Sequence, residues 1–450
     1  MKRKREAKIG LIGEGVMIVG IDPAICVIDI AKKRHCVKII DSKGYELSKA
    51  MMVYNNREGF ERLESVIEVV KRKNGLKRVV IGMEPTGHYW KNIAYYFDDR
   101  GFSIVFVNPY HVHTSKEMWD NSPTKSDPKD ALLIGNLIRE GKFFNANLVR
   151  GVYAELRRLG KIYFRLKRKM WRAKSELYNL IDEYFPEFHN MFSRKFGKAA
   201  RYILEEYFFP KEILRVGFEK MREELRRVTR CRLGENKMED IYSVAEKSVG
   251  IKEAKNSAEL EMGLVLDEID SLQLKLKKVV LRMKQCIDKT SYGKYLFSIP
   301  GINISTVGIF LGEIGDPLRY SCSGEIIKLS GLNLKEDSSG EHIGKKKISK
   351  RGRALLRWSL CRGFLSCINR GRNKELSLWY KDLVENKKME KTKAIVAGGT
   401  KLARIMFSLI KNKEFYDSKK ILNREEIIDN SATEGDIPVV AYEGSGGETA

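Results

Sequence analysis

Two acidic residues near the start of the sequence stand at the ends of apolar runs, where a strand would leave a side chain at the edge of a sheet. Asp29 lies near the end of the run 25–30, and Glu84 directly follows the run 79–83. Short apolar runs of this kind predict buried strands. If the two strands end at the same edge, their carboxylates are placed to share a cation.

A second acidic pair, Asp127 and Asp130, is spaced as one helical turn. Pro128 suits the first turn of a helix capped by Asp127, so the two carboxylates would face the same way. Four gathered carboxylates would bind Mg²⁺, which prefers oxygen ligands, and two such ions can clamp the attacking and leaving oxygens of a phosphodiester. Each acid alone could be an ordinary cap or surface charge, so the metal interpretation depends on the set.

The elements that must position these acids form an α/β layer. Apolar runs predict strands, and apolar residues at helical spacing predict helices between them. The order is strands, helix, strand, helix, strand, helix, which is typical of helices packed over a mixed sheet. The expected strands are 17–21, 25–30, 36–40, 79–83 and 104–107, and the expected helices are 56–73, 88–100 and the one that begins at Asp127.

Beyond Asp127 the pattern is nearly all helical. Residues 155–185 predict one long helix that is basic and rich in aromatic residues. A second long helix is expected within 250–288, where a seam of apolar residues is spaced three or four apart: Ile269, Leu272, Leu276, Val279, Met283 and Ile287. The seam is typical of a coiled coil and equally of a helix packed inside one bundle. Either arrangement makes this segment a rigid spacer.

The charge balance favours a polyanionic partner. The formal net charge is +25, although residues 421–450 hold seven acidic residues against one basic residue, Arg424. DNA or RNA is the first expectation for so basic a chain, and a basic protein that binds no nucleic acid is the alternative. Residues 431–450 are rich in Gly, Ser, Thr and acids, and we expect the acidic tail 421–450 to stay disordered.

Several classes of protein are disfavoured. The seven cysteines and six histidines show no zinc-binding spacing, and unpaired cysteines fit a reducing compartment. The sequence has no run of 18 apolar residues, so it predicts no membrane span. The basic start 1–5 is followed by too short an apolar run, broken by Glu14, for a signal peptide. We expect a cytoplasmic protein with no membrane partner.

The motifs that carry the acids resemble those of the DEDD insertion-sequence transposases, the IS110 family. They are Asp29-Ile-Ala-Lys-Lys-Arg-His35, Glu84-Pro-Thr-Gly-His-Tyr-Trp90, and Asn108-Pro followed by Lys125-Ser-Asp-Pro-Lys-Asp-Ala131. The resemblance implies that Asp29, Glu84, Asp127 and Asp130 form a catalytic tetrad that holds Mg²⁺ in a RuvC-like, ribonuclease-H-like domain. Asp22, in Val19-Gly-Ile-Asp22-Pro, mimics the same strand. The residues that follow Asp29 favour Asp29, and the duplicated pattern leaves the strand register open.

A second block extends the resemblance over residues 290–410. Phe297-Ser-Ile-Pro-Gly-Ile302 resembles the family's helix–hairpin–helix, with Asn303 in place of a second glycine. Because Asn tolerates a positive φ, we expect the hairpin to survive. The segment Ser338-Ser339-Gly340 follows, and the resemblance implies that Ser339 is the nucleophile of a phosphoserine intermediate. Without the family, Ser-Ser-Gly is a common turn.

The chemistry of a serine nucleophile is consistent with the residues nearby. A serine hydroxyl needs a base or a metal to activate it. The one histidine close in sequence is His342, so a metal-assisted route is reasonable. A covalent link also conserves the energy of the broken bond for rejoining.

Basic residues after the candidate serine would neutralise phosphates beside the scissile bond, unless they form only a solvated face. They are Lys345, Lys346, Lys347, Lys350, Arg351, Arg353 and Arg357. The segment 161–174 mixes basic and aromatic residues that could bind an RNA backbone and stack bases. At helical spacing such aromatic residues are more often part of the core.

The resemblance also implies the partners. A non-coding guide RNA, called a bridge RNA, would pair with donor and target DNA. A composite site, with the acids and the serine from different subunits, implies a homo-oligomer, either a dimer or a tetramer, acting at the nucleoid.

The sequence therefore predicts an α/β domain followed by all-α domains. The expected parts are a RuvC-like catalytic domain at 17–145, a helical or coiled-coil connector at 150–290, a serine-bearing helical transposase domain at 291–420 and the acidic tail at 421–450. The expected activity is RNA-guided DNA transposition through a Mg²⁺-assisted phosphoserine. Two alternatives are a RuvC-type endonuclease that uses water and a non-catalytic nucleic-acid-binding protein.

Overall fold

The computed structural model describes residues 16–22, 33–85, 87–119, 127–192, 197–335, 338–339, 342–343 and 347–419. For 16–22, 116–119, 127–130, 338–339 and 342–343 it describes the backbone alone. The chain divides into two compact units, residues 1–148 and 149–450. The strand expected at 25–30 lies outside the described residues.

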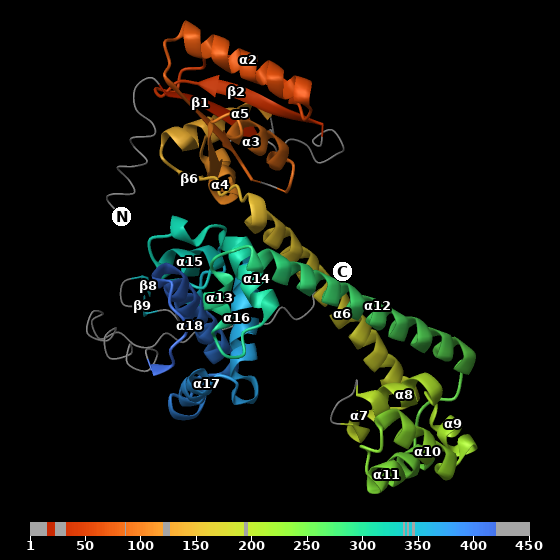
Figure 1. The fold of residues 1–450 in the computed structure, drawn as a ribbon. Coiled ribbons are helices and arrows are strands. Elements are labelled where there is room, and N and C mark those ends of the chain that lie inside the picture. The colour runs from red at the N-terminus through yellow and green to blue at the C-terminus, as the bar shows by residue number, and fades with distance from the viewer. Residues whose placement is uncertain are drawn as a thin grey trace. The chain divides into compact units, whose positions relative to one another are not determined.

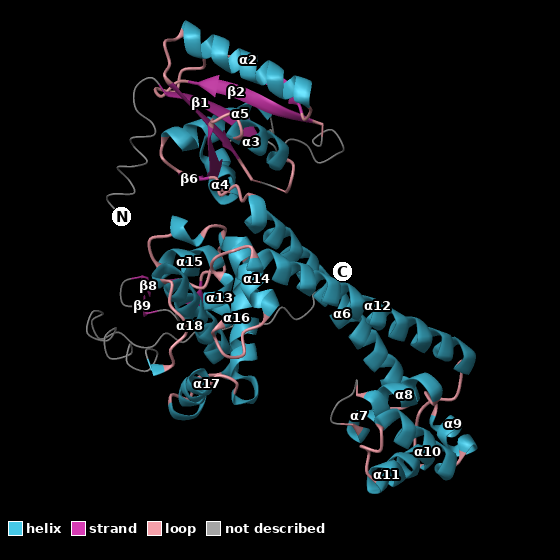
Figure 2. Cartoon of the chain, in the orientation of Figure 1, coloured by secondary structure: helices cyan, strands magenta, loops and turns pink. Residues whose placement is uncertain are grey.

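The amino-terminal unit is built on a six-stranded mixed sheet (Figures 1 and 2). The strand order is β3-β2-β1-β4-β5-β6, in which β1, β3, β4 and β5 run in one direction and β2 and β6 in the other. The elements are β1 (Val16–Asp22), β2 (Arg34–Ile40), β3 (Met51–Tyr54), α2 (Arg57–Lys73), β4 (Arg78–Met83), α3 (Trp90–Asp98), β5 (Ser103–Val107), α4 (Pro109–Trp119), α5 (Asp127–Arg139) and β6 (Phe143–Asn145).

Two separate apolar cores cover the faces of this sheet. Alternate strand residues point to opposite faces, so Ile81 packs with α2 and α3 while its neighbour Val80 packs with α4 and α5. Strand β4 is buried from Val79 to Met83, as expected for a central strand covered on both faces. The α/β prediction for this unit is confirmed.

The second unit is almost entirely helical and is organised around two long helices (Figure 2). Helices α6 (Gly151–Tyr184) and α12 (Lys255–Asp288) pack along each other, and α6 also packs on α14 (Ile304–Ile314). Between α6 and α12 lie the shorter helices α7 (Phe188–Met191), α8 (Lys198–Glu206), α9 (Pro210–Val216), α10 (Phe218–Thr229) and α11 (Glu235–Glu246).

The rest of this unit follows α12 and contains helices of various lengths and two small strand pairs. They are α13 (Gly293–Phe297), η1 (Pro317–Arg319), α15 (Ser323–Ser330), β7 (Leu334–Lys335), β8 (Ser338–Ser339), β9 (His342–Ile343), β10 (Lys347–Ile348), α16 (Ala354–Ile368), η2 (Asn369–Gly371), α17 (Lys374–Lys381), η3 (Asp382–Asn386) and α18 (Lys391–Asn412). One apolar core joins these helices to α6 and α12. No helix in the described part of the chain is long and apolar enough to cross a membrane.

The apolar seam expected along α12 is present and faces this core. Five of its six residues are buried, and Val279 is partly buried against them. Within the chain the seam packs on α6, so the two long helices share one core.

The crossing of α6 and α14 is unusually close. A Cβ at Gly312 would lie 2.5 Å from the backbone nitrogen of Arg157, so a glycine is required there. The Arg157 guanidinium also donates to the carbonyls of Gly312 and Glu313, at 2.9 and 2.8 Å. These bonds satisfy carbonyls at the end of α14, where the helix has no partners of its own.

Candidate active site

Strands β1 and β4 bring two acidic positions side by side. The strands are parallel and Ile21 pairs with Met83, so Asp22 and Glu84 are the next positions on neighbouring strands. Parallel strands lie about 4.8 Å apart. The Glu84 side chain is half-buried. This sheet edge therefore carries acidic residues, as the sequence predicted for Glu84.

The other three predicted ligands are placed less completely. Asp127 begins α5, as predicted, and Asp130 lies in its first turn. The side chains of both residues, and Asp29 as a whole, lie outside what the structure describes. Among described side chains no group of three His, Cys, Asp or Glu residues is arranged to hold a metal ion. That search does not reach Asp29, Asp127 or Asp130, so the tetrad stays a prediction.

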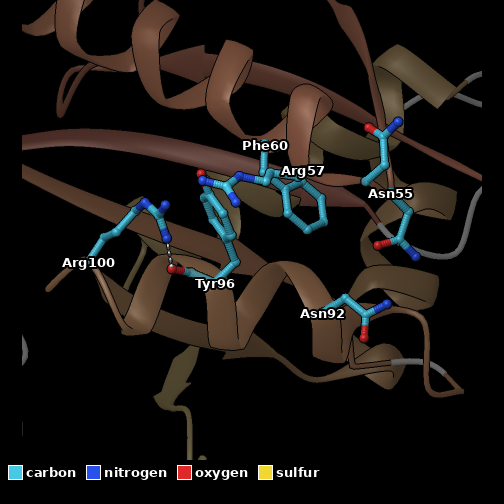
Figure 3. A pocket seen from close by; sticks show the side chains of 7 residues that line it. Asn55, Arg57, Phe60, Asn92, Tyr96 and Arg100 are labelled. Atoms are coloured by element: carbon cyan, nitrogen blue, oxygen red, sulfur yellow. Dashed lines mark hydrogen bonds between the residues drawn. The ribbon is translucent and has the colours of Figure 1, made fainter.

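Sequence reasoning missed a groove between α2 and α3, shown in Figure 3. One wall of the groove is formed by the ring of Tyr96, which contacts Phe60. The Arg100 guanidinium stacks on the Tyr96 ring, 3.6 Å from its centre. Arg100 also donates to Glu64 at 2.8 Å, which balances its charge. The lining residues are Asn55, Asn56, Arg57, Phe60, Asn92, Tyr96 and Arg100.

This groove has a defined relation to the acidic edge of the sheet. Strand β3 runs parallel to β1 and β4, because both β1 and β3 pair antiparallel with β2. Asn55 follows β3 and Glu84 follows β4, so both follow strands that end at the same edge. The only sequence signal was the polar run Asn55-Asn56-Arg57 directly after a strand.

In the second unit, a short pair of strands joins the two ends of the segment that carries Ser339. Strand β7 pairs with β10, with Leu334 opposite Ile348. Below this pair, Ser349 donates through its backbone nitrogen to the carbonyl of Asn333 and through its hydroxyl to the Asn333 amide oxygen, each at 2.8 Å. These bonds join the two ends of the segment to each other, and Leu332 and Ile348 at those ends belong to the helical core.

The backbone of the segment places Ser339 opposite His342. Strands β8 and β9 are antiparallel, and Ser339 pairs with His342 in their register. Directly opposed residues of an antiparallel pair are near neighbours. His342 is therefore the histidine position closest to the candidate nucleophile along this ribbon.

Two residues of the predicted phosphate-binding run are engaged by the protein itself. Arg353 donates to the carbonyl of Glu313 and forms an ion pair with its carboxylate at 3.6 Å. The Glu313 side chain is only 7% exposed and that of Arg353 only 26%. Arg357 donates to the carbonyl of Ser330 at 2.8 Å. These bonds give Arg353 and Arg357 a structural role, whether or not they also meet phosphate.

The remainder of the run is accessible where it is described. Lys347, Lys350 and Arg351 are exposed, and Lys345 and Lys346 lie outside the described residues. Their exposure leaves Lys347, Lys350 and Arg351 accessible to a phosphate from solvent. They fit the predicted phosphate contacts better, and their role stays a prediction.

Two family models match separate regions of this chain. A DEDD transposase model matches residues 26–186, and a model for the IS116/IS110/IS902 transposase family matches residues 293–380. The chain belongs to the IS110 family of transposases. The first match includes Asp29, Glu84, Asp127 and Asp130 but not Asp22, and the second includes Ser339.

Two relatives of this IS110-family chain are known by name. It is 33% identical over 121 residues to the transposase for insertion sequence element IS1111A of Coxiella burnetii, over 26% of this chain and 33% of that one. It is 22% identical over 342 residues to the mini-circle transposase for IS117 of Streptomyces coelicolor, over 73% of this chain and 81% of that one. The chain therefore matches about a third of the length of the IS1111A protein and most of the IS117 protein.

The turn before α14 corrects one expectation about this family member. Asn303 does not take a positive φ, since its φ is −107° and its side chain caps α14 by accepting from the Thr306 nitrogen at 2.7 Å. The positive φ, +81°, falls on Gly301. A helix cap needs an extended backbone and a short polar side chain, and Asn supplies both.

Proposed function

We propose that this protein is a DNA transposase that cuts and rejoins phosphodiester bonds through Ser339. The observation that carries the proposal is the presence in one chain of both family regions. One contains the four acids, with Glu84 at a strand end beside β1 and Asp127 at the start of α5, and the other contains Ser339. The net charge of +25 supports a nucleic-acid substrate.

The chemistry proposed for Ser339 is a phosphoryl transfer. The hydroxyl oxygen forms a bond to phosphorus while the bond from phosphorus to the leaving strand end breaks, and the hydroxyl proton is passed to a base. The strand end takes up a proton as it leaves. Rejoining is the reverse reaction with a different strand end, so no bond energy is lost to water.

The acids are proposed to hold Mg²⁺. The fit rests on the position of Glu84 next to the end of β1 and on carboxylate oxygens being the ligands that this ion prefers. When bound, the ion would stabilise the charge that develops on the phosphate oxygens. We propose Asp29, Glu84, Asp127 and Asp130 as the ligands. His342, opposite Ser339 in the β8–β9 register, is a second means of accepting the proton.

The finer features of the activity follow the family resemblance. We propose that a guide RNA selects donor and target DNA, and that two or more subunits combine their acids and serines. The mixed sheet, with three antiparallel strands followed by two parallel ones, supports a RuvC-like fold for the first unit. The helix–turn–helix from α13 to α14 supports a helix–hairpin–helix.

One specific alternative is a metal-dependent endonuclease of the RuvC type. It would use the same acids with water as the nucleophile, and Ser339 would only shape a turn. The position of Glu84 is equally consistent with it. A protein that only binds nucleic acid is the third possibility.

One assay separates these functions. The full chain is incubated with Mg²⁺, the RNA transcribed from beside its gene and DNA that carries the element's junction, and the products are run on a denaturing gel. The transposase should form a covalent protein–DNA adduct that disappears in Ser339→Ala and in Glu84→Gln. Cleavage that survives Ser339→Ala without any adduct would instead establish the nuclease, and binding without cleavage would leave a scaffold.

A second arm tests the proton acceptor. If His342 accepts the serine proton, His342→Gln should slow adduct formation and flatten its dependence on pH near the histidine pKa. An unchanged pH profile in this variant would assign activation of the serine to the metal.

A further inference from the structure

Helices α6 and α16 of the second unit form an aromatic cluster on the surface of the protein. Trp358 of α16 lies edge-on to Phe164 and Trp171 of α6, with ring centres 4.9 and 6.2 Å apart. Trp171 is 46% exposed, and Phe164 and Trp358 are half-buried. A core cluster would be covered, as Phe364 on the same α16 is. The Trp171 ring is therefore accessible from solvent.

The two helix segments that carry this cluster bear charges of one sign. Between Glu155 and Glu176, α6 carries nine basic residues and no acidic one, and α16 carries two basic residues and no acidic one. Arg165, Arg168, Lys169 and Arg172 are exposed, and none of them forms an ion pair within the described part of the chain. The pKa of Lys174 is lowered, first by burial and then by the positive charge of the neighbouring Lys167.

The basic and aromatic positions follow the helix in parallel lines. Phe164, Arg168 and Trp171 are spaced four and three residues apart, so they lie on one face of α6. The two aromatic positions are separated by about 10 Å along the axis, from the rise of 1.5 Å per residue. Arg165 and Arg172 form the adjoining line. An extended ligand lying along the helix would meet cations and rings in alternation.

We propose that this α6–α16 patch binds an unpaired nucleic-acid strand. Its bases would stack on Trp171 and on the edge of the Phe164–Trp358 pair, and its phosphates would lie against Arg165, Arg168 and Arg172. Only such a strand offers a polyanionic backbone together with planar faces that are free to stack. Duplex DNA offers the charge without accessible faces. The inference rests on the nucleic-acid partner of the proposed function, but not on its cutting chemistry.

The test measures binding of the full chain to labelled 20-nucleotide probes by fluorescence anisotropy. The probes are oligo-U RNA, oligo-dT DNA and a duplex DNA of the same length, each at three salt concentrations. Trp171→Leu keeps an apolar side chain at this position and removes the stacking ring. It should weaken binding of the single strands about fivefold or more. It should leave duplex binding and the unfolding midpoint unchanged.

The charged half of the patch is tested with Arg168→Gln/Arg172→Gln. This variant should reduce the slope of log affinity against log salt by about 1.4, from about 0.7 per phosphate contact on a single strand. The matched control is Lys220→Gln/Lys247→Gln, which removes one exposed cation from α10 and one from the end of α11. The control should leave the slope as it is.

The outcomes are distinct. A preference for oligo-U or for oligo-dT that is lost in Trp171→Leu supports the proposal and assigns the strand to RNA or to DNA. Single-strand binding that Trp171→Leu leaves intact would overturn the proposal. It would also be overturned if Trp171→Leu weakened binding to acidic-lipid vesicles but not to single strands. Ser339→Ala should bind both strands normally, so failure of the cutting chemistry does not affect this result.

Discussion

Replacing Arg353 tests whether this residue holds the fold or contacts phosphate. Its guanidinium pairs with the Glu313 carboxylate at 3.6 Å and donates to the Glu313 carbonyl at the end of α14. Arg353→Met keeps the length of the side chain but leaves Glu313, which is 7% exposed, without this partner. Removing one member of a buried pair costs about 3–5 kcal/mol. Because Arg353 is itself a quarter exposed, we expect about 2–3 kcal/mol.

The assay for Arg353→Met is thermal or urea unfolding of the full chain followed by circular dichroism. In a unit of this size the loss should lower the Tm by about 5 °C. Removing both charges in Arg353→Met/Glu313→Gln should restore much of the stability, since no uncompensated buried charge remains. The matched control is Lys347→Met, an exposed residue of the same basic run, which should change stability by less than about 0.5 kcal/mol.

The result that would refute this reasoning is specific. If Arg353→Met unfolds like the unmodified protein and loses nucleic-acid affinity as Lys347→Met does, Arg353 is a phosphate contact. The structural role assigned from its bonds to Glu313 would then be wrong.

Three further outcomes are expected. Asp29→Asn should abolish adduct formation while Asp22→Asn preserves it, and the reverse result would move the first metal ligand to the end of β1. Burial lowers the pKa of His35 to about 4, so the unfolded chain takes up a proton near pH 6.5 that the folded chain takes up only near pH 4. Stability should be full above pH 6.5 and fall by about 3 kcal/mol as the pH drops to 4, and urea titrations of His35→Leu should lose this slope. Gly301→Ala should cost more than Gly371→Ala in Tm, since both have positive φ but a Cβ at Gly301 would lie 2.9 Å from Cys367 Cα while Gly371 faces open space.

Much of the fold could be predicted from residue spacing, because strands and helices differ in their apolar period. The buried strand β4 and the seam of α12 are the clearest cases. Periodicity identifies an apolar face but not the surface that covers it. The sequence of that seam is therefore equally consistent with a coiled coil and with a helix inside a bundle. Only the tertiary structure shows that it packs on α6 within the chain.

The roles of individual charged and aromatic residues were harder to predict. Arg353 looked like its basic neighbours, and its partner Glu313 lies 40 positions away. Trp171 has the helical spacing of a core residue, yet it is 46% exposed, and its described aromatic neighbour is Trp358 of α16. Asn303 tolerates a positive φ, but in the structure its φ is −107° and it caps a helix. In each case the deciding neighbour is distant in sequence.

The close crossing of α6 and α14 has a consequence for how the protein is made. Arg157 and Gly312 meet across 155 positions, whereas the sheet of the first unit is complete by residue 145. At ribosomal speeds of about 5–20 residues per second, α6 waits roughly 8–30 seconds for α14 to emerge. The first unit can mature during translation, while the part of α6 that packs on α14 stays uncovered through that interval. Nascent chains stalled between residues 185 and 300 should therefore be the forms that chaperones hold and proteases cut.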